Sequence, residues 1–282
     1  AAFSLLSFLG WVAGALGSFI ISSVYGLEAF GLSFGQAHVV LFAAVGLLNL
    51  SITPFLLLVK EAPSTRHDGR IFPRKSAKVV AKYGAYSVLI AVGAGLFVPL
   101  MAYWFSSAYG VADAASGLVL GLTNLLTAGV VVVSPRLARK VGLVKATVLT
   151  QALSTIFMVA MPSAPTFEAA ASIYLIRVFL MNLSNPLTQS LVMGLVSPDE
   201  RGIASGVSAS LWRLPNALSA NLGYGLMASG LLATPFYLAT GLYVVAIALF
   251  WVLFKDARLP EERKPAQLPT QESSFEGPET ER

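Results

Sequence analysis

The chain has 282 residues, of which 56% are hydrophobic and 12% are charged, and its mean hydropathy is +0.73. Soluble domains carry about a quarter charged residues and are less than half apolar, so this composition argues strongly against a soluble enzyme or binding module. The sequence has no cysteine, which excludes disulfides, thiolate metal sites and cysteine nucleophiles. The net charge of +5 fits either nucleic acid or a membrane surface, and its placement along the chain distinguishes them.

Eight apolar runs follow one another along the sequence. Each can cross a bilayer as a helix, for which about 20 residues suffice. The runs lack the period-2 alternation of a membrane barrel, and backbone groups in lipid must pair within their own segment. We therefore predict an all-α membrane protein with eight transmembrane helices. The runs cover residues 2–23, 37–59, 79–106, 112–133, 143–162, 167–196, 203–229 and 233–254.

Lysine and arginine are distributed unevenly among the connections. In chain order, the segments that follow the eight runs hold 0, 7, 0, 4, 0, 1, 0 and 5 such residues. Because positively charged connections stay in the cytoplasm, we predict a multi-pass protein of the cell membrane with a cytoplasmic C-terminus. The basic charge is then explained by topology. The expected partner is the lipid bilayer and not nucleic acid.

The first run is similar to the seventh. A shift of 201 residues aligns Ser4 with Ser205, Ser7 with Ser208, Trp11 with Trp212 and Gly14 with Pro215. Each of the two runs also precedes one further span and then a basic segment. If the runs are equivalent, we expect a protein of about 405 residues with twelve spans in two halves of six, from which about 124 N-terminal residues are missing. Ala1 in place of Met agrees with that expectation.

This interpretation divides the chain into four parts. Residues 1–59 are the last two helices of an N-terminal six-helix half, and residues 60–78 are a cytoplasmic central loop. Residues 79–256 are a C-terminal six-helix half. Residues 257–282 are rich in Pro, Glu, Gln and Ser, and we predict a disordered cytoplasmic tail.

Two short segments resemble a known family. The connection after the fourth run reads Leu-Ala-Arg-Lys-Val-Gly and is similar to the second-half copy of the loop motif G-x-L-A-D-R-x-G-R-K of the major facilitator superfamily. Residues 197–206 resemble the segment that enters the family's eleventh helix. The chain thus resembles helices five to twelve of a twelve-helix member. In the loop motif Leu137, Ala138, Lys140 and Gly142 fit, whereas Pro135 and Arg139 replace the first Gly and the Asp.

The resemblance implies a secondary active transporter that moves a small molecule by rocker-switch alternating access. It also implies a gating role for the loop motif and coupling to a proton or another ion. The branch most similar in general pattern exports drugs or metabolites. We expect a monomer without cofactor or metal, and no enzyme signature such as H-E-x-x-H or a Walker loop occurs in the sequence.

Two runs carry a polar face at membrane depth. At 100° per residue, Arg177 of run 167–196 shares a face with several hydroxyl and amide side chains, opposite an apolar arc that we expect to face lipid. The apolar arc comprises Ile176, Leu180, Leu183, Leu187 and Leu191. In run 203–229, Arg213 lies on a polar arc opposite leucines. A charge within a bilayer normally faces a cavity or a partner.

These faces supply the candidates for a substrate cavity. Either arginine could instead be neutralised by a carboxylate or a helix C-terminus and brace two helices, and Asn124 could join helices rather than contact substrate. A pair of cavity arginines would suit a carboxylate or phosphate, so an organic-anion uptake carrier is the alternative to efflux. A non-transporting membrane receptor or scaffold is the alternative of another class. The candidates are Arg177, Arg213, Asn216, Asn185, Gln189, Asn182, Asn124 and Tyr86.

Overall fold

The computed structural model describes residues 10, 12–18, 20, 26–27, 30–54, 58 and 73–257. Within those residues the chain forms helices and turns and no strand, which confirms the predicted all-α class. Residues 12–18 are helical. The further elements are α3 (Phe34–Leu50), α5 (Ala77–Gly95), η1 (Val98–Leu100), α6 (Met101–Tyr109), α7 (Asp113–Val141), α8 (Leu143–Ala160), η2 (Met161–Ser163), α9 (Phe167–Leu195), η3 (Pro198–Glu200), α10 (Arg201–Ala228) and α11 (Thr234–Phe254).

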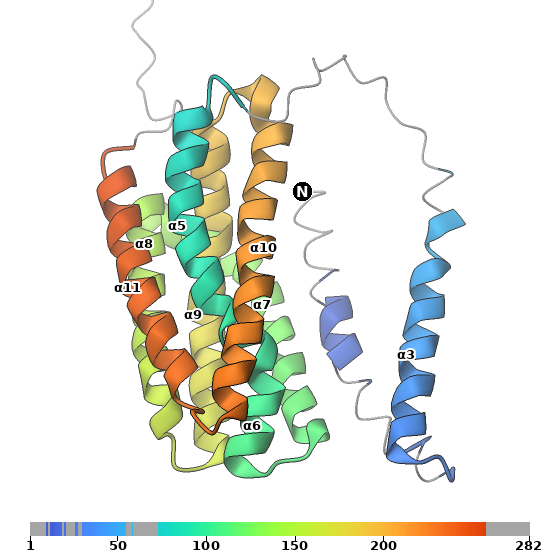
Figure 1. The fold of residues 1–282 in the computed structure, drawn as a ribbon. Helices are drawn as coiled ribbons and strands as arrows, with labels where there is room; N and C mark the ends of the chain where they lie inside the picture. Colours follow the sequence, from blue (N-terminus) through green and yellow to red (C-terminus); the bar gives the residue numbers. More distant parts are fainter. Residues whose placement is uncertain are drawn as a thin grey trace, which may run out of the picture.

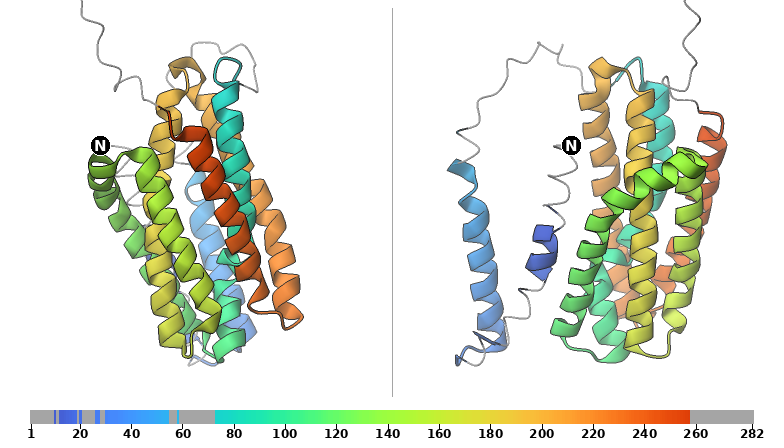
Figure 2. Two further views of the ribbon diagram at one scale, coloured as in Figure 1. Left: turned by 90° about the vertical axis from the view of Figure 1, so that its left-hand side faces the viewer. Right: turned by 180° about the vertical axis from the view of Figure 1, so that it is seen from behind.

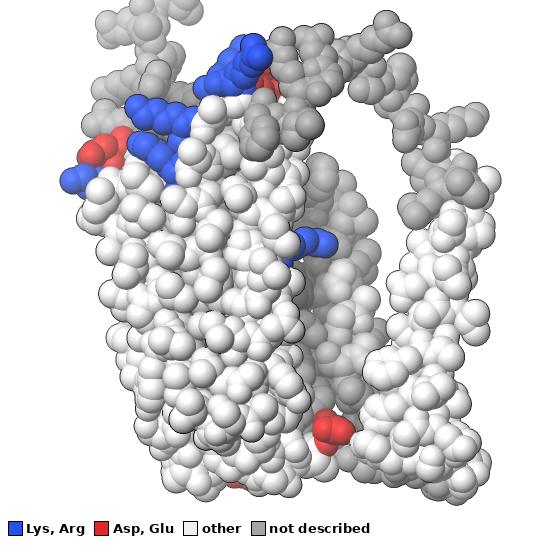
Figure 3. All heavy atoms as spheres, viewed as in Figure 1, with Lys and Arg blue, Asp and Glu red and all other residues white. Residues whose placement is uncertain are grey.

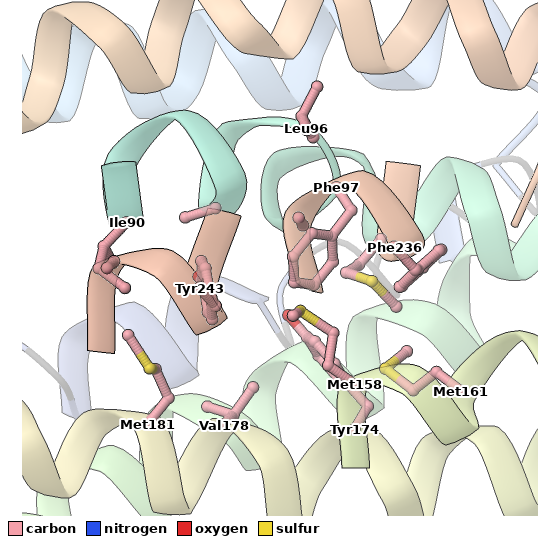
Figure 4. Close-up of a cluster of buried hydrophobic side chains, with 14 of the residues drawn as sticks. Ile90, Leu96, Phe97, Met158, Met161, Tyr174, Val178, Met181, Phe236 and Tyr243 are labelled. Carbon is pink, nitrogen blue, oxygen red and sulfur yellow. The ribbon is translucent and has the colours of Figure 1, made fainter. Parts of the chain in front are cut away.

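The helices from α5 to α11 form an upright bundle, with α3 standing apart from it (Figures 1 and 2). Within the bundle α9 packs against α7 and α8, and α5 packs against α10 and α11. The α8–α11 contact joins these two groups of helices. Large aromatic side chains fill the space between α5, α6, α9 and α11, including Phe97, Trp104, Phe236 and Tyr243. Figure 4 shows three of them, Phe97, Phe236 and Tyr243.

Five described segments are long and apolar enough to cross a membrane. They are Ala77–Tyr109, Asp113–Val130, Leu143–Ser163, Phe167–Leu195 and Thr234–Phe254. α3 is apolar but shorter, and α10 is long but contains two arginines, two asparagines and four serines that lower its hydropathy. The predicted number of eight spans is therefore not established. The first predicted run lies partly outside the described residues, as do most of the central loop and the tail beyond residue 257.

The run predicted as one helix over residues 79–106 is interrupted in the structure. α5 ends at Gly95, a short 3-10 turn follows at η1, and α6 begins at Met101. Pro99 lies in that turn, and proline has no backbone N–H to continue a helical hydrogen-bond ladder. Pro99 is thus a local cause of the interruption, and a count of apolar residues does not reveal it.

α5 and α10 approach each other closely at this interruption. A Cβ atom added to Gly223 of α10 would overlap the backbone carbonyl of Leu96, and one added to Gly95 would overlap the carbonyl of Asn216. Both positions therefore need glycine for the two backbones to touch. Contacts of this kind between small residues are the usual means of close helix packing in membranes.

A buried carboxylate joins the start of α5 to the connection between α9 and α10. Glu200 accepts hydrogen bonds from three successive backbone N–H groups, at 2.8 Å from Arg74, 3.0 Å from Lys75 and 2.8 Å from Ser76. The Ser197 N–H in turn donates to Ser76 Oγ at 3.0 Å. Burial alone would raise the pKa of Glu200, but these hydrogen bonds hold that pKa below its ordinary value. We call this arrangement the Glu200 clamp.

Replacement of Gly223 by alanine should lower the free energy of unfolding by at least about 1–3 kcal/mol, because the new methyl group meets backbone that cannot rotate away. Thermal unfolding in detergent measures the loss. Gly225→Ala is the matched control on the same helix, since a Cβ there would meet nothing within 4 Å. Equal melting temperatures for the two variants would contradict the close α5–α10 packing.

Replacement of Glu200 by glutamine should lower thermal stability near neutral pH, because an amide cannot accept all three N–H groups as a carboxylate does. A depressed folded-state pKa means that the ionised clamp stabilises the protein above the ordinary carboxyl pKa of 4.5 and loses this contribution as the pH falls through the folded value. The melting-temperature difference between wild type and variant should therefore shrink in acid. Asp199→Asn, which removes the exposed ion pair with Lys75, should change stability little at either pH.

Candidate functional site

A pocket of about 490 Å³ lies between α5, α9 and α10. Its size is typical of small-molecule sites. Polar and apolar side chains both line it, and five of the predicted candidates are among them. The lining consists of Tyr83, Tyr86, Ser87 and Ile90 of α5, Met181, Asn182, Asn185, Thr188, Gln189, Val192 and Met193 of α9, and Ser205, Ser208, Ala209, Trp212 and Arg213 of α10.

The pocket runs from mid-depth of the bundle toward the Glu200 clamp. Arg213 and Asn182 lie near the middle of the 28-residue α10 and the 29-residue α9. Tyr83, Met193 and Ser205 lie near the helix ends that the clamp brings together. Most lysines and arginines of the bundle gather at this same end, seen at the top of Figure 3. The cavity thus occupies the half of the bundle closer to its basic end.

Arg213 contributes the positive charge of the pocket wall. Its side chain is exposed, and within the described residues it has no hydrogen-bond or ion-pair partner. On the same helix Ser208 Oγ is buried and also without a partner in the described part of the chain. The exposed guanidinium of Arg213 therefore leaves hydrogen-bond donors available to a bound molecule or to water, whereas the Ser208 hydroxyl is enclosed.

The asparagines of α9 are fixed by neighbouring side chains. Asn182 donates to Thr127 Oγ1 of α7 at 3.1 Å, and Asn185 donates to Asn182 Oδ1 at 2.8 Å. This chain of hydrogen bonds orients both amides along the pocket wall. Gln189, one turn further along α9, is exposed at the pocket and has no hydrogen-bond partner among the described residues.

Tyr86 is held from behind by a residue of α8. The Gln151 amide donates to the Tyr86 hydroxyl and, at 2.9 Å, to Ser184 Oγ of α9. Gln151 is 1% exposed, so its amide ties α5, α8 and α9 together inside the bundle. Sequence reasoning did not select Gln151. Its signal was the one amide side chain of run 143–162, whose other polar residues at membrane depth are threonines and a serine.

Arg177 lies in the aromatic core and not among the pocket-lining residues. It is 3% exposed and donates to the Tyr243 hydroxyl of α11 at 3.0 Å. Its guanidinium carbon is 4.8 Å from the centre of the Phe97 ring. Figure 4 shows Phe97, Tyr174 and Tyr243 converging between the helices. Hydrogen bonding and cation–π contact thus hold this charge as a brace between α9, α11 and the end of α5.

Two other candidates also contact protein instead of the pocket. Asn216 donates to the Ala91 carbonyl of α5 at 3.2 Å, beside the close α5–α10 packing. Asn124 of α7 donates to Ser18 Oγ at 3.2 Å, which links α7 to the helical residues 12–18. Both amides join helices, the alternative role raised for Asn124 from sequence.

The apolar arc of α9 faces outward only in part, since Ile176 is 45% exposed but three of the leucines are buried. Leu183, Leu187 and Leu191 are 2–4% exposed, because α9 is covered by α7 and α8 on the side away from the pocket. The arc was judged from one helix alone, which cannot reveal neighbours. On α10 the apolar side is exposed, since Leu214 and Leu218 are both 64% exposed.

The loop-motif residues form a tight turn between α7 and α8. Gly142 has a φ of 85°, a conformation that favours glycine, and its N–H donates to the Ala138 carbonyl at 2.8 Å. Leu137 and Ala138 are half-buried, whereas Lys140 is exposed in the last helical turn. A basic side chain there complements the negative end of the helix dipole.

The family model of the Major Facilitator Superfamily matches residues 87–277, which is more than half of the chain. The chain therefore belongs to the major facilitator superfamily, a family of membrane transporters rather than enzymes. No curated protein matches it. Membership agrees with the apolar helices of the bundle and with the family predicted from the two sequence segments.

If Arg177 is a brace, Arg177→Met should lower the free energy of unfolding by about 1–3 kcal/mol, through loss of a charged hydrogen bond and a cation–π contact. Tyr243→Phe should then cost little in the Arg177→Met background. A double-mutant cycle measured by thermal unfolding detects this coupling. Additive losses would contradict the brace, and a raised substrate KM with unchanged stability would instead assign Arg177 to the substrate cavity.

Proposed function

We propose that this protein is a secondary active transporter that carries small molecules by rocker-switch alternating access. The observation that carries the proposal is the mid-depth pocket, walled by three helices of a bundle that belongs to a transporter family. Its wall contains polar side chains, Arg213 and several amides, together with a tryptophan and methionines. The polar side chains of such a wall allow water to enter the pathway, and the polar and apolar side chains together can bind a solute.

The helix contacts at the pocket support a two-state motion. α5 and α10 touch through backbone at Gly95 and Gly223, and such smooth contacts let helices slide with little side-chain interlock. α5 is interrupted at Pro99, next to this contact. These features supply a place where the pocket wall can bend, and the loop motif at Gly142 would act in gating at the basic end.

We further propose export of drugs or metabolites as the direction, coupled to a proton or another ion, by a monomer in the cell membrane. The distribution of lysine and arginine supports an orientation with the basic end of the bundle and the C-terminus in the cytoplasm. In that orientation the pocket lies in the cytoplasmic half. The division into an N-terminal pair of helices (1–59), a central loop (60–78), a six-helix half (79–256) and a tail (257–282) remains part of this proposal.

Flux into proteoliposomes tests the function. The full-length protein, reconstituted and challenged with a panel of labelled drugs and metabolites under an imposed proton gradient, should accumulate or release at least one compound faster than empty liposomes. Ser208→Trp should reduce that flux to the level of empty liposomes, because the indole fills the pocket. Leu218→Trp is the matched control on the exposed face of α10 and should retain flux.

Absence of flux for every compound, with folded protein in the liposomes, would favour a receptor or scaffold. Flux that survives Ser208→Trp would show that the pathway lies elsewhere. Flux measured under proton gradients of opposite direction distinguishes export from uptake, because only one direction of the gradient accelerates substrate flux by a coupled exporter.

A further inference from the structure

We propose that the pocket between α5, α9 and α10 selects organic anions: molecules with a carboxylate or similar oxyanion attached to an apolar body. This inference rests on the proposed transport function and names the substrate class of the same site. Arg213 pairs with the anionic group, and the apolar side chains of the pocket receive the remainder of the molecule.

The charge of the pocket is of one sign. Of the described residues that line it, Arg213 is the charged one, and neither aspartate nor glutamate is among them. Arg213 also has no ion-pair partner within the described part of the chain. A cation at membrane depth is costly unless water or an opposite charge compensates it. An anionic solute supplies that compensation, whereas a cationic solute would meet repulsion.

Arg177, which is buried, differs from Arg213 in its surroundings. Arg177 is enclosed by Phe97 and Tyr243 and donates to a phenol. Arg213 is exposed at a cavity wall instead. A guanidinium presents five N–H donors in a planar fork that matches a carboxylate. The free fork on Arg213 is therefore available to a ligand, and the one on Arg177 is not.

A neighbouring group at the pocket adds to this match. Gln189 faces the pocket from α9 and can donate through its amide. Hydrogen bonds from neutral groups to a charged acceptor are stronger than those to neutral acceptors, which favours an anion over an isosteric amide.

The rest of the wall accepts an apolar body. Ile90, Met181, Val192 and Met193 line the pocket together with Trp212, the residue before Arg213. Methionine side chains are flexible and polarisable, so they adapt to aromatic or aliphatic groups of differing shape. A pocket of about 490 Å³ accommodates one compact drug-sized molecule.

The test compares an anion with its uncharged analogue. Full-length protein in proteoliposomes is given salicylate or salicylamide, and a wider set of aromatic carboxylates with their amides, while flux and KM are measured. For carboxylates that are transported, Arg213→Gln should raise KM at least about tenfold, the effect of losing one charged hydrogen-bonded pair. Arg213→Lys should give an intermediate KM, because lysine keeps the charge without the fork. KM for amides should change little.

Lys255→Gln is the matched control, since it removes the same charge at the end of α11, outside this pocket. Flux of cationic or neutral compounds only, or carboxylate flux unaltered by Arg213→Gln, would overturn the anion proposal while leaving transport established. An equal loss for carboxylates and amides, with a lowered melting temperature, would also overturn it, because Arg213 would then be structural. Absence of flux for every compound would contradict the transport function itself.

Discussion

The carboxylate of Glu200 is the contact on which the pocket most depends. By accepting three successive backbone N–H groups, it fixes the start of α5 against the connection between α9 and α10, and these three helices are the walls of the pocket. One fully ionised acceptor for three donors is a strong, directional arrangement. It gives a structural meaning to the segment Ser-Pro-Asp-Glu-Arg, which from sequence was only a likeness to a family.

A second constraint acts between mid-depth and the end of the bundle away from the clamp. There the backbones of α5 and α10 touch at Gly95 and Gly223, and the interruption of α5 at Pro99 lies beside this contact. The pocket thus lies between two places where α5 is held against its neighbours: the Glu200 clamp at one end and the α5–α10 backbone contact at the other. Gln151 secures the α5 wall from behind through Tyr86, so the wall is supported by α8, a helix that does not line the pocket.

Sequence patterns predicted the all-α class and the family. They also selected Arg213, because its charge is costly in lipid, and the structure places it on the pocket wall. Gly142 was selected by its match to the loop motif, and the structure places it in a turn with a positive φ. Apolar length separated most helices of the bundle because it is a local property, but it missed the interruption after α5. Asn182, Asn185 and Gln189 share a helix face, and that face does line the pocket.

The remainder could not be predicted because it depends on neighbours. Arg177 lies close to the same wheel position as Thr188, which lines the pocket, yet aromatic rings from α11 and from the end of α5 enclose Arg177. Leu187 belongs to an apolar arc, but α9 is covered by helices on that side also. A helical wheel distinguishes polar from apolar faces and cannot tell lipid from protein. The Glu200 clamp, likewise, joins residues more than a hundred positions apart.

The central claim is that substrate passes through the pocket of α5, α9 and α10. Because the sequence has no cysteine, Gln189→Cys places one thiol on the pocket wall, and its rate of maleimide labelling can be measured with and without a transported compound. At a concentration ten times Kd the compound should slow labelling about tenfold by occupancy, while Ser172→Cys, exposed elsewhere on α9, should react at an unchanged rate. Equal labelling of Gln189→Cys in both conditions would contradict the account.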